Sequence, residues 1–210
     1  MRLSFLPLFT VLVCLTSGVS AAPVVQVDTS AGSFKLQLDS DKAPETVKNF
    51  LGYVEDGSYV GTIFHRVIAG FMIQGGGHLP DMTEVAEKGT IRNEADNGLK
   101  NTVGTIAMAR MQEIDSAGRQ FFINVEQNDY LDHSEQSCTR EDEKAWLEAQ
   151  EKGLRKPLLC KSFGYAVFGR VVEGMDVVHT IELVETGRVG DYDDVPRSPV
   201  VITGMTRVSE

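Results

Sequence analysis

The chain has 210 residues, with 20 lysines and arginines against 30 aspartates and glutamates, so its formal net charge at pH 7 is −10. This acidic balance disfavours nucleic acids and anionic membranes as partners, because both bind basic proteins. The length is sufficient for one domain with a full hydrophobic core.

Residues 1–21 have the pattern of a secretory signal peptide. Arg2 supplies the positive charge, an apolar stretch runs from Leu3 to Leu15, and the small residues of TSGVSAA follow. The apolar stretch is too short for a transmembrane helix and ends in a cleavage-type pattern. We expect cleavage after Ala21, which leaves one domain over residues 22–210 with no membrane attachment. A retained anchor is the alternative.

The first segments of the mature chain change from strand to helix periodicity. Residues 24–39 alternate apolar and polar side chains about the turn Ser30–Gly32, which predicts a β-hairpin. Residues 44–55 have apolar side chains at helical spacing (Val47, Phe50, Leu51 and Val54), with Pro44 in the first turn. This pattern predicts an amphipathic helix.

Further short strands follow, and they are separated by turn signals. We expect them within residues 62–68, 71–76, 104–110, 120–125, 163–172 and 195–208, with a short helix from 174 to about 182. Many short strands with only two helices predict an all-β fold built on a closed antiparallel sheet, because closure removes exposed strand edges.

One segment, residues 134–162, is highly charged and interrupts the β pattern. Within it, residues 139–153 predict a helix, with Thr139 and Asp142 placed to cap its start and Gly153 to end it. We interpret the segment as an inserted surface excursion.

Two cysteines remain after cleavage, Cys138 and Cys160, and they bracket the inserted helix. A single pair in an exported protein predicts a disulfide at the base of the insert. Free thiols or a partial metal site are the alternatives. The four histidines lack ligand spacing, so we expect no metal site.

The stretch TIFHRVIAGFMIQGG (62–76) places one charged residue, Arg66, among apolar side chains. Arg66 is either the buried partner of a carboxylate such as Glu94, or it faces an apolar pocket and acts on a ligand. Apolar walls with few polar anchors are typical of a small-ligand site. Candidate walls and anchors are Phe71, Met72, Phe122, Gln74 and Gln120, with core packing as the alternative for Met72 and Phe122.

The motif FHRVIAGFMIQGG is followed in order by GTIAMAR, SAGRQFFINV, YLDH and GYAVFGRVVEGMDVV. Together they resemble the cyclophilin-type peptidyl-prolyl cis-trans isomerases, most of all the exported bacterial ones. The resemblance covers nearly all of residues 24–208 except the insert. It implies an eight-stranded antiparallel barrel capped by two α-helices, and isomerisation of Xaa-Pro bonds. No covalent bond breaks in this reaction, so no cofactor or metal is expected.

The resemblance also implies roles for single residues. Arg66 matches the catalytic arginine. The matching substrate-binding residues are Phe71, Met72, Gln74, Ala109, Arg110, Gln120, Phe122, Tyr130, Leu131 and Tyr165. Three of them depart from the eukaryotic pattern of asparagine, tryptophan and histidine, namely Arg110, Tyr130 and Tyr165. Loss of the tryptophan indole donor predicts weak cyclosporin binding.

The expected partners are proline-containing polypeptides that fold after export, with the periplasm of a Gram-negative bacterium as the compartment and a monomer as the default state. Two other functions stay open. The chain could be a proline-peptide binding module with little turnover. The insert could dock a partner or restrict substrates beside the site, or it could be a neutral variable loop.

Overall fold

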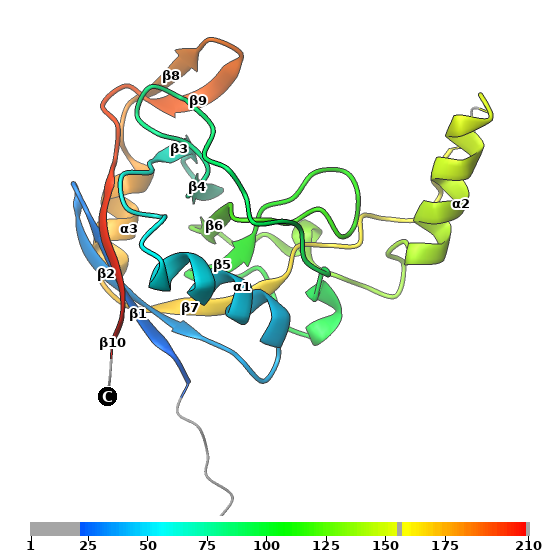
Figure 1. Ribbon diagram of the computed structural model, residues 1–210, viewed down its shortest axis with the longest axis horizontal. Coiled ribbons are helices and arrows are strands. Elements are labelled where there is room, and N and C mark those ends of the chain that lie inside the picture. The colour runs from blue at the N-terminus through cyan, green and yellow to red at the C-terminus, as the bar shows by residue number, and fades with distance from the viewer. Residues whose placement is uncertain (1–21, 155–156, 209–210) are drawn as a thin grey trace, which may run out of the picture.

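The computed structural model describes residues 22–154 and 157–208, so the predicted signal peptide lies outside the described residues. An eight-stranded antiparallel sheet forms the body of the molecule (Figure 1), with strand order β10-β1-β2-β7-β5-β6-β4-β3. Its strands are β1 (Val24–Thr29), β2 (Gly32–Leu38), β3 (Phe64–Ile68), β4 (Met72–Gly75), β5 (Thr105–Met108), β6 (Phe121–Asn124), β7 (Val167–Glu173) and β10 (Ile202–Val208).

The sheet curls until its two outer strands approach each other. Ile63, just before β3, forms an isolated antiparallel bridge with Val201, just before β10. The N–H of Phe64 donates to the carbonyl of Val200 over 3.0 Å. The predicted antiparallel barrel fold is confirmed, with its outer strands joined by a single bridge instead of a full ladder.

The interior of the curled sheet holds one aromatic-rich core. Phe50, Tyr59 and Phe121 are fully buried there, with the Phe50 and Phe121 rings 5.6 Å apart in an edge-on arrangement. Such burial of apolar area is the main favourable term in folding. The packing of these inward side chains fixes the spacing of neighbouring strands. It thereby also fixes the spacing of the side chains that point outward from the same strands.

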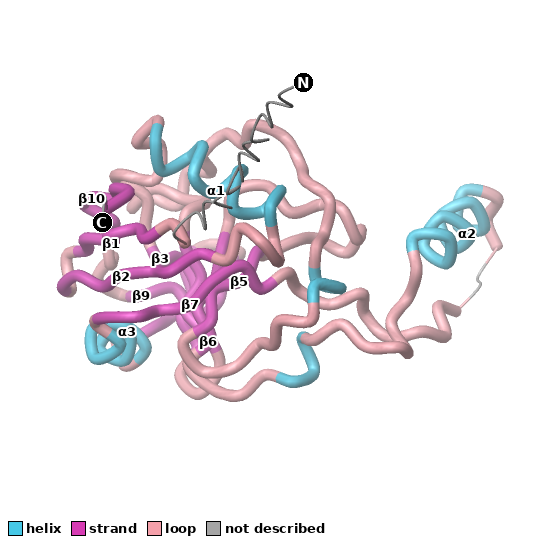
Figure 2. Tube along the Cα trace, turned by 90° about the horizontal axis from the view of Figure 1, so that it is seen from below, coloured by secondary structure: helices cyan, strands magenta, loops and turns pink. Residues whose placement is uncertain are grey.

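Helices α1 (Pro44–Glu55) and α3 (Met175–Glu182) lie on opposite sides of the strands (Figure 2). At the start of α1, the Glu94 carboxylate accepts hydrogen bonds from the N–H groups of Glu45 and Thr46, over 3.2 and 2.9 Å. A carboxylate at a helix N-terminus satisfies free N–H groups and interacts favourably with the helix dipole. The Glu94 carboxylate is therefore bound to the start of α1. The structure does not pair it with Arg66, so that alternative is wrong.

The last part of the chain differs from the expectation. A separate hairpin forms from β8 (Thr186–Val189) and β9 (Tyr192–Pro196), and β10 begins only at Ile202. The predicted strand over 195–208 is thus divided between two sheets. Pro199 explains the break, because proline lacks the N–H that a continuous ladder requires.

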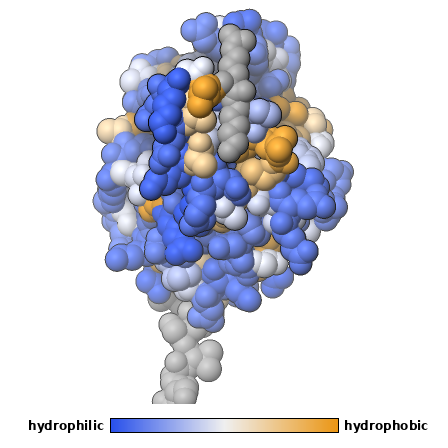
Figure 3. All heavy atoms as spheres, turned by 90° about the vertical axis from the view of Figure 1, so that its right-hand side faces the viewer, coloured by the Kyte–Doolittle hydropathy of each residue, from blue (hydrophilic) through white to orange (hydrophobic). Residues whose placement is uncertain are grey.

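Helix α2 (Arg140–Glu151) stands away from the barrel, as Figures 1 and 2 both show. The Thr139 hydroxyl accepts from the N–H of Asp142, and the Asp142 side chain accepts from the N–H of Thr139, so the predicted cap is confirmed. The structure joins Cys138 and Cys160 in a disulfide. The face that carries the insert is largely hydrophilic, with a few apolar patches (Figure 3).

In the part of the chain that the structure describes, none of the helices has the length and apolar character needed to cross a membrane.

Candidate active site

The site begins with a row of cross-strand neighbours. Arg66 on β3 pairs in register with Gln74 on β4, which pairs with Phe122 on β6. Directly opposed residues of adjacent strands point to the same face of a sheet. The row therefore places a guanidinium, an amide and an aromatic ring next to one another. Arg66 is exposed, whereas Phe122 is only 4% exposed.

An apolar cluster surrounds this row, distinct from the barrel core. We call it the outer apolar patch. Its buried members are Met72, Ala107, Phe122, Leu131 and Val167, and its half-buried members include Ile68, Phe71, Leu99, Ala109 and Tyr165. Six predicted site residues thus meet in one place, although they come from five segments of the chain: Phe71, Met72, Ala109, Phe122, Leu131 and Tyr165.

Two aromatic contacts form the rim of the outer apolar patch. The Phe71 and Tyr130 rings lie 5.9 Å apart, and Tyr130 is 69% exposed. The Phe122 and Tyr165 rings lie 5.7 Å apart in an edge-on arrangement. Edge-on and tilted pairs are favourable ring geometries. The rim rings are therefore partly fixed before any ligand arrives.

The polar residues are placed at the edge of the patch. Gln74 Nε2 donates to Gln120 Oε1 over 2.9 Å. The N–H of Ala109 donates to the carbonyl of Gln120 over 2.9 Å. Arg110 lies with its guanidinium 4.8 Å from the centre of the Tyr165 ring and donates from Nε to the carbonyl of Gly164. Its charge is thus turned toward residues 162–165, and burial lowers its pKa from the usual value.

Among the arginines that the structure describes, the fully buried one is Arg119 and not Arg66. Arg119 is 1% exposed, and its guanidinium donates to the carbonyls of Gly76, Ala86 and Ser58 over 2.6, 2.9 and 2.7 Å. The Tyr53 ring lies 5.0 Å away. Sequence reasoning missed this residue, because its partners are backbone carbonyls of distant segments.

A buried asparagine network behind the patch was also missed. Asn128 Nδ2 donates to the carbonyl of Phe71 over 3.0 Å and to Asn124 Oδ1 over 2.7 Å. Asn124 Nδ2 in turn donates to Asn101 Oδ1 over 3.2 Å. These linked hydrogen bonds fix the backbone of Phe71 relative to the segment that carries Tyr130 and Leu131. Three asparagines beside predicted strand ends were the available signal.

A histidine pair lies beneath the row. His65 and His78 are 4% and 3% exposed, and their ring centres are 4.3 Å apart. Both nitrogens of His78 and Nδ1 of His65 are buried without a hydrogen-bond partner among the described residues. Burial, with a smaller contribution from His78, lowers the pKa of His65 to about 4. Both rings are therefore neutral at pH 7.

A large cavity in the described part lies away from this site. It measures about 1160 Å³ between α1, β2 and β7, and none of the predicted site residues lines it. Among the residues described, no three His, Cys, Asp or Glu side chains are placed to hold a metal ion. The candidate site itself is an open surface with apolar and cationic groups, suited to binding an extended chain.

Comparison with known proteins decides the family. The model of the family described as "Cyclophilin type peptidyl-prolyl cis-trans isomerase/CLD" matches residues 24–207. The chain belongs to this family. Its activity is therefore peptidyl-prolyl cis-trans isomerisation.

Similar bacterial cyclophilins span nearly the whole chain. Peptidyl-prolyl cis-trans isomerase B of Escherichia coli is 49% identical over 187 residues, which are 89% of this chain and 100% of that protein. Peptidyl-prolyl cis-trans isomerase A of Dickeya dadantii is 49% identical over 178 residues, covering 85% and 80% of the two chains. A cyclophilin-type isomerase of Cryptosporidium parvum shares the fold, with a TM-score of 0.67 at 23% identity over 90% of this chain and 99% of its own.

Proposed function

We propose that this cyclophilin accelerates Xaa-Pro isomerisation in proteins that fold after export, with Arg66 as the catalytic residue. The observation that carries the proposal is the row in which Arg66, Gln74 and Phe122 lie side by side at the edge of the outer apolar patch. A proline ring packed on Phe122 would place its amide bond beside the guanidinium.

The reaction explains why this row is sufficient. Rotation about a peptide bond has a barrier of about 18–20 kcal/mol, set by amide resonance. Uncatalysed exchange before proline takes roughly 10–100 s. Since no covalent bond breaks, the enzyme has only to bind the twisted state more tightly than either planar isomer.

Arg66 supports this preference electrostatically. In the twisted state the prolyl nitrogen gains a localised lone pair, so a donor beside it stabilises that state selectively. Apolar walls strengthen such an interaction because they exclude water. A guanidinium suits the role because it stays charged in proteins and offers several N–H donors. The exposed position of Arg66 leaves these donors accessible to a peptide.

The apolar patch and its polar rim define the partner class as proline-containing polypeptides. A related structure, that of the Cryptosporidium parvum cyclophilin-type isomerase, was determined in the presence of the dipeptide Ala-Pro. For this chain we assign peptide binding to Phe71, Met72, Gln74, Ala109, Arg110, Gln120, Phe122, Tyr130, Leu131 and Tyr165. A monomer and weak cyclosporin binding complete the proposal.

Export to the periplasm rests on the leader pattern of residues 1–21 and on the Cys138–Cys160 disulfide, which an oxidising compartment favours. Expression of the full chain in a Gram-negative host, with fractionation and N-terminal sequencing, tests it. We expect a periplasmic product beginning at Ala22. A cytoplasmic product that keeps residues 1–21 contradicts export.

Peptide exchange spectroscopy on a short Xaa-Pro peptide separates the enzyme from a binding module. We expect catalytic amounts of the folded protein to accelerate exchange far beyond the uncatalysed rate. Peptide binding without acceleration would favour the binding module.

A further inference from the structure

Residues 110–117, which we call the 110–117 loop, connect two parts of the candidate site. The loop starts after Ala109 in the outer apolar patch, and the chain returns to the site at Gln120 and Phe122. The position of the loop therefore bears on the residues at both of its ends.

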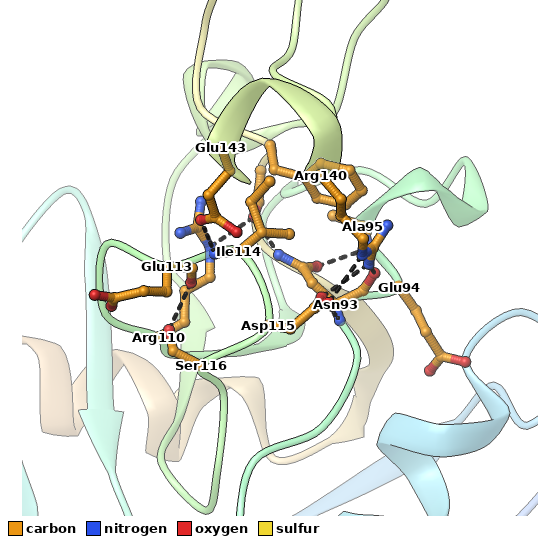
Figure 4. Close-up of polar contacts among 12 residues, drawn as sticks. Asn93, Glu94, Ala95, Arg110, Glu113, Ile114, Asp115, Ser116, Arg140 and Glu143 are labelled. Atoms are coloured by element: carbon orange, nitrogen blue, oxygen red, sulfur yellow. Dashed lines mark hydrogen bonds and ion pairs between the residues drawn. The ribbon is translucent and has the colours of Figure 1, made fainter. Parts of the chain in front are cut away.

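Helix α2 contacts this loop through a two-pronged ion pair. Arg140 Nε donates to Asp115 Oδ2, and Arg140 Nη2 donates to Asp115 Oδ1, each over 2.8 Å (Figure 4). Nη2 also donates to the carbonyl of Asn93 over 3.0 Å. Bidentate pairs between arginine and carboxylate combine strength with directional precision. The hydrogen bonds from Arg140 lower the pKa of Asp115, which keeps the carboxylate charged.

A second contact comes from the next turn of the same helix. The carboxylate of Glu143 accepts the hydrogen bond of the Ile114 N–H. Figure 4 shows Arg140 and Glu143 reaching from α2 to the tip of the loop. Ile114 itself is 3% exposed and packs in a small cluster with Phe163, over which Arg140 lies at 4.8 Å.

The start of the loop is fixed to the segment that follows the insert. Arg110 donates from Nε to the carbonyl of Gly164 over 3.0 Å and from Nη2 to the Ser162 hydroxyl over 2.7 Å. Asn93 Nδ2 donates to the same Gly164 carbonyl. Gly164 has φ +100°, and a Cβ there would lie 2.6 Å from the N of His133, so this position requires glycine. Tyr165 of the patch rim follows directly.

We propose that Arg140 is a positioning residue of the isomerase. Helix α2, in an insert whose two ends are joined by the Cys138–Cys160 disulfide, holds the 110–117 loop through Asp115 and Ile114. The loop then holds Arg110, and with it Tyr165, against the outer apolar patch. The inserted helix thereby sets the affinity of the site for peptide. This inference rests on the proposed function.

The mechanism predicts an effect on binding and not on the chemical step. Arg66 lies on β3, whose neighbours in the sheet are set by the barrel and not by the insert. Loosening the loop therefore leaves the Arg66 guanidinium in place. It makes the aromatic rim that contacts the peptide less well ordered. Preorganised contacts of this kind lower the cost of binding, so their loss raises KM.

The test compares Arg140→Ala with Lys144→Ala, which removes the same charge from an exposed position one turn further along α2. With a short Xaa-Pro peptide, we expect Arg140→Ala to raise KM about three- to tenfold, with kcat changed less than twofold. Lys144→Ala should change neither. Arg140→Lys should recover only part of the loss, because lysine lacks the bidentate geometry.

A double-mutant cycle of Arg140→Ala and Asp115→Ala tests whether Arg140 acts through its ion pair with Asp115. The KM effects of the two single variants should be strongly non-additive if they act through one contact. Glu143→Ala, which removes the acceptor of the Ile114 N–H, should speed hydrogen exchange across the 110–117 loop and raise KM in the same way.

Three results would overturn the inference. They are an Arg140→Ala variant indistinguishable from Lys144→Ala, a loss confined to kcat, and additive effects of Arg140→Ala and Asp115→Ala. An inactive wild-type protein would instead contradict the proposed function itself, so the two failures are distinguishable.

Discussion

The Gln120 side chain lies between Gln74, its hydrogen-bond partner, and Gly77, which has no side chain to displace it. Its Oε1 accepts from Gln74 Nε2 over 2.9 Å, and a Cβ added at Gly77 would lie 2.5 Å from its Cδ. The last glycine of the run Gly75–Gly77 is thus a site of close approach. It permits the Gln120 amide to pack flat beside the row that contains Arg66.

We predict that Gly77→Ala displaces the Gln120 side chain and lowers kcat/KM by about tenfold, because peptide-orienting groups must be held to within a fraction of an ångström. Gly52→Ala is the matched control, since a Cβ there meets only Lys88 Nζ at 3.7 Å. Neither glycine has a left-handed backbone, so neither substitution strains the backbone. Equal activity of the two variants would show that Gln120 does not orient the peptide.

The buried Arg119 is predicted to be structural. Arg119→Met leaves the carbonyls of Gly76, Ala86 and Ser58 without their donor, and each unsatisfied buried group costs about 1–3 kcal/mol. We expect a loss of about 3 kcal/mol or more in the free energy of unfolding, measured with urea. Arg66→Met, at an exposed position, is the control and should cost little stability. Similar losses for both variants would contradict the assignment.

The His65–His78 pair predicts a pH dependence of stability. The pKa of His65 is about 4 in the folded chain against a usual value of 6.5, and burial also lowers the pKa of His78. The unfolded chain therefore binds more protons between these values, so stability is complete above about pH 6.5 and falls as the pH drops toward 4. His65 alone accounts for at most about 3 kcal/mol.

Urea unfolding between pH 7 and 4 checks this dependence. His78→Phe should flatten the fall, because it removes one buried titrating ring. His179→Gln, which alters an exposed histidine of α3 outside this pair, is the control variant. An unchanged slope in His78→Phe would mean that carboxylates alone set the acid sensitivity.

The disulfide is predicted to stabilise the insert locally. Cys138 and Cys160 are 22 positions apart, and closing a loop of this length contributes about 3 kcal/mol in the chain-entropy model. Replacing both by alanine should speed hydrogen exchange in α2 while leaving β1 and β2 protected. Thiol titration of the denatured wild type should find both cysteines oxidised. Unaltered exchange in α2 would show that its polar contacts suffice.

Local signals in the sequence predicted several elements well. The helix over Pro44–Glu55 has the predicted bounds, because its apolar spacing and its first-turn proline are local. The helix of the insert was predicted from the Thr139–Asp142 cap for the same reason. The hairpin of β8 and β9 was missed, since its polar strands lack the apolar alternation on which strand prediction depends.

Contacts between residues far apart in the sequence could not be predicted from such local signals. The residues of the outer apolar patch were grouped through their motif resemblance, because periodicity alone favoured core packing for Met72 and Phe122. Arg119 bonds carbonyls 33 to 61 positions away, and Arg140 meets Asp115 across 25 positions. Backbone acceptors leave no trace in a side-chain pattern, and a single ion pair among so many charges has no distinguishing spacing.

The central claim is that Arg66 stabilises the twisted Xaa-Pro bond. The most direct measurement is kcat/KM for a short Xaa-Pro peptide with wild type, Arg66→Ala and Arg66→Lys, each checked for an unchanged unfolding midpoint. We predict a loss of about 10²–10³-fold in Arg66→Ala, the size expected for one transition-state donor, and partial recovery in Arg66→Lys. A folded Arg66→Ala variant with wild-type turnover would contradict the account.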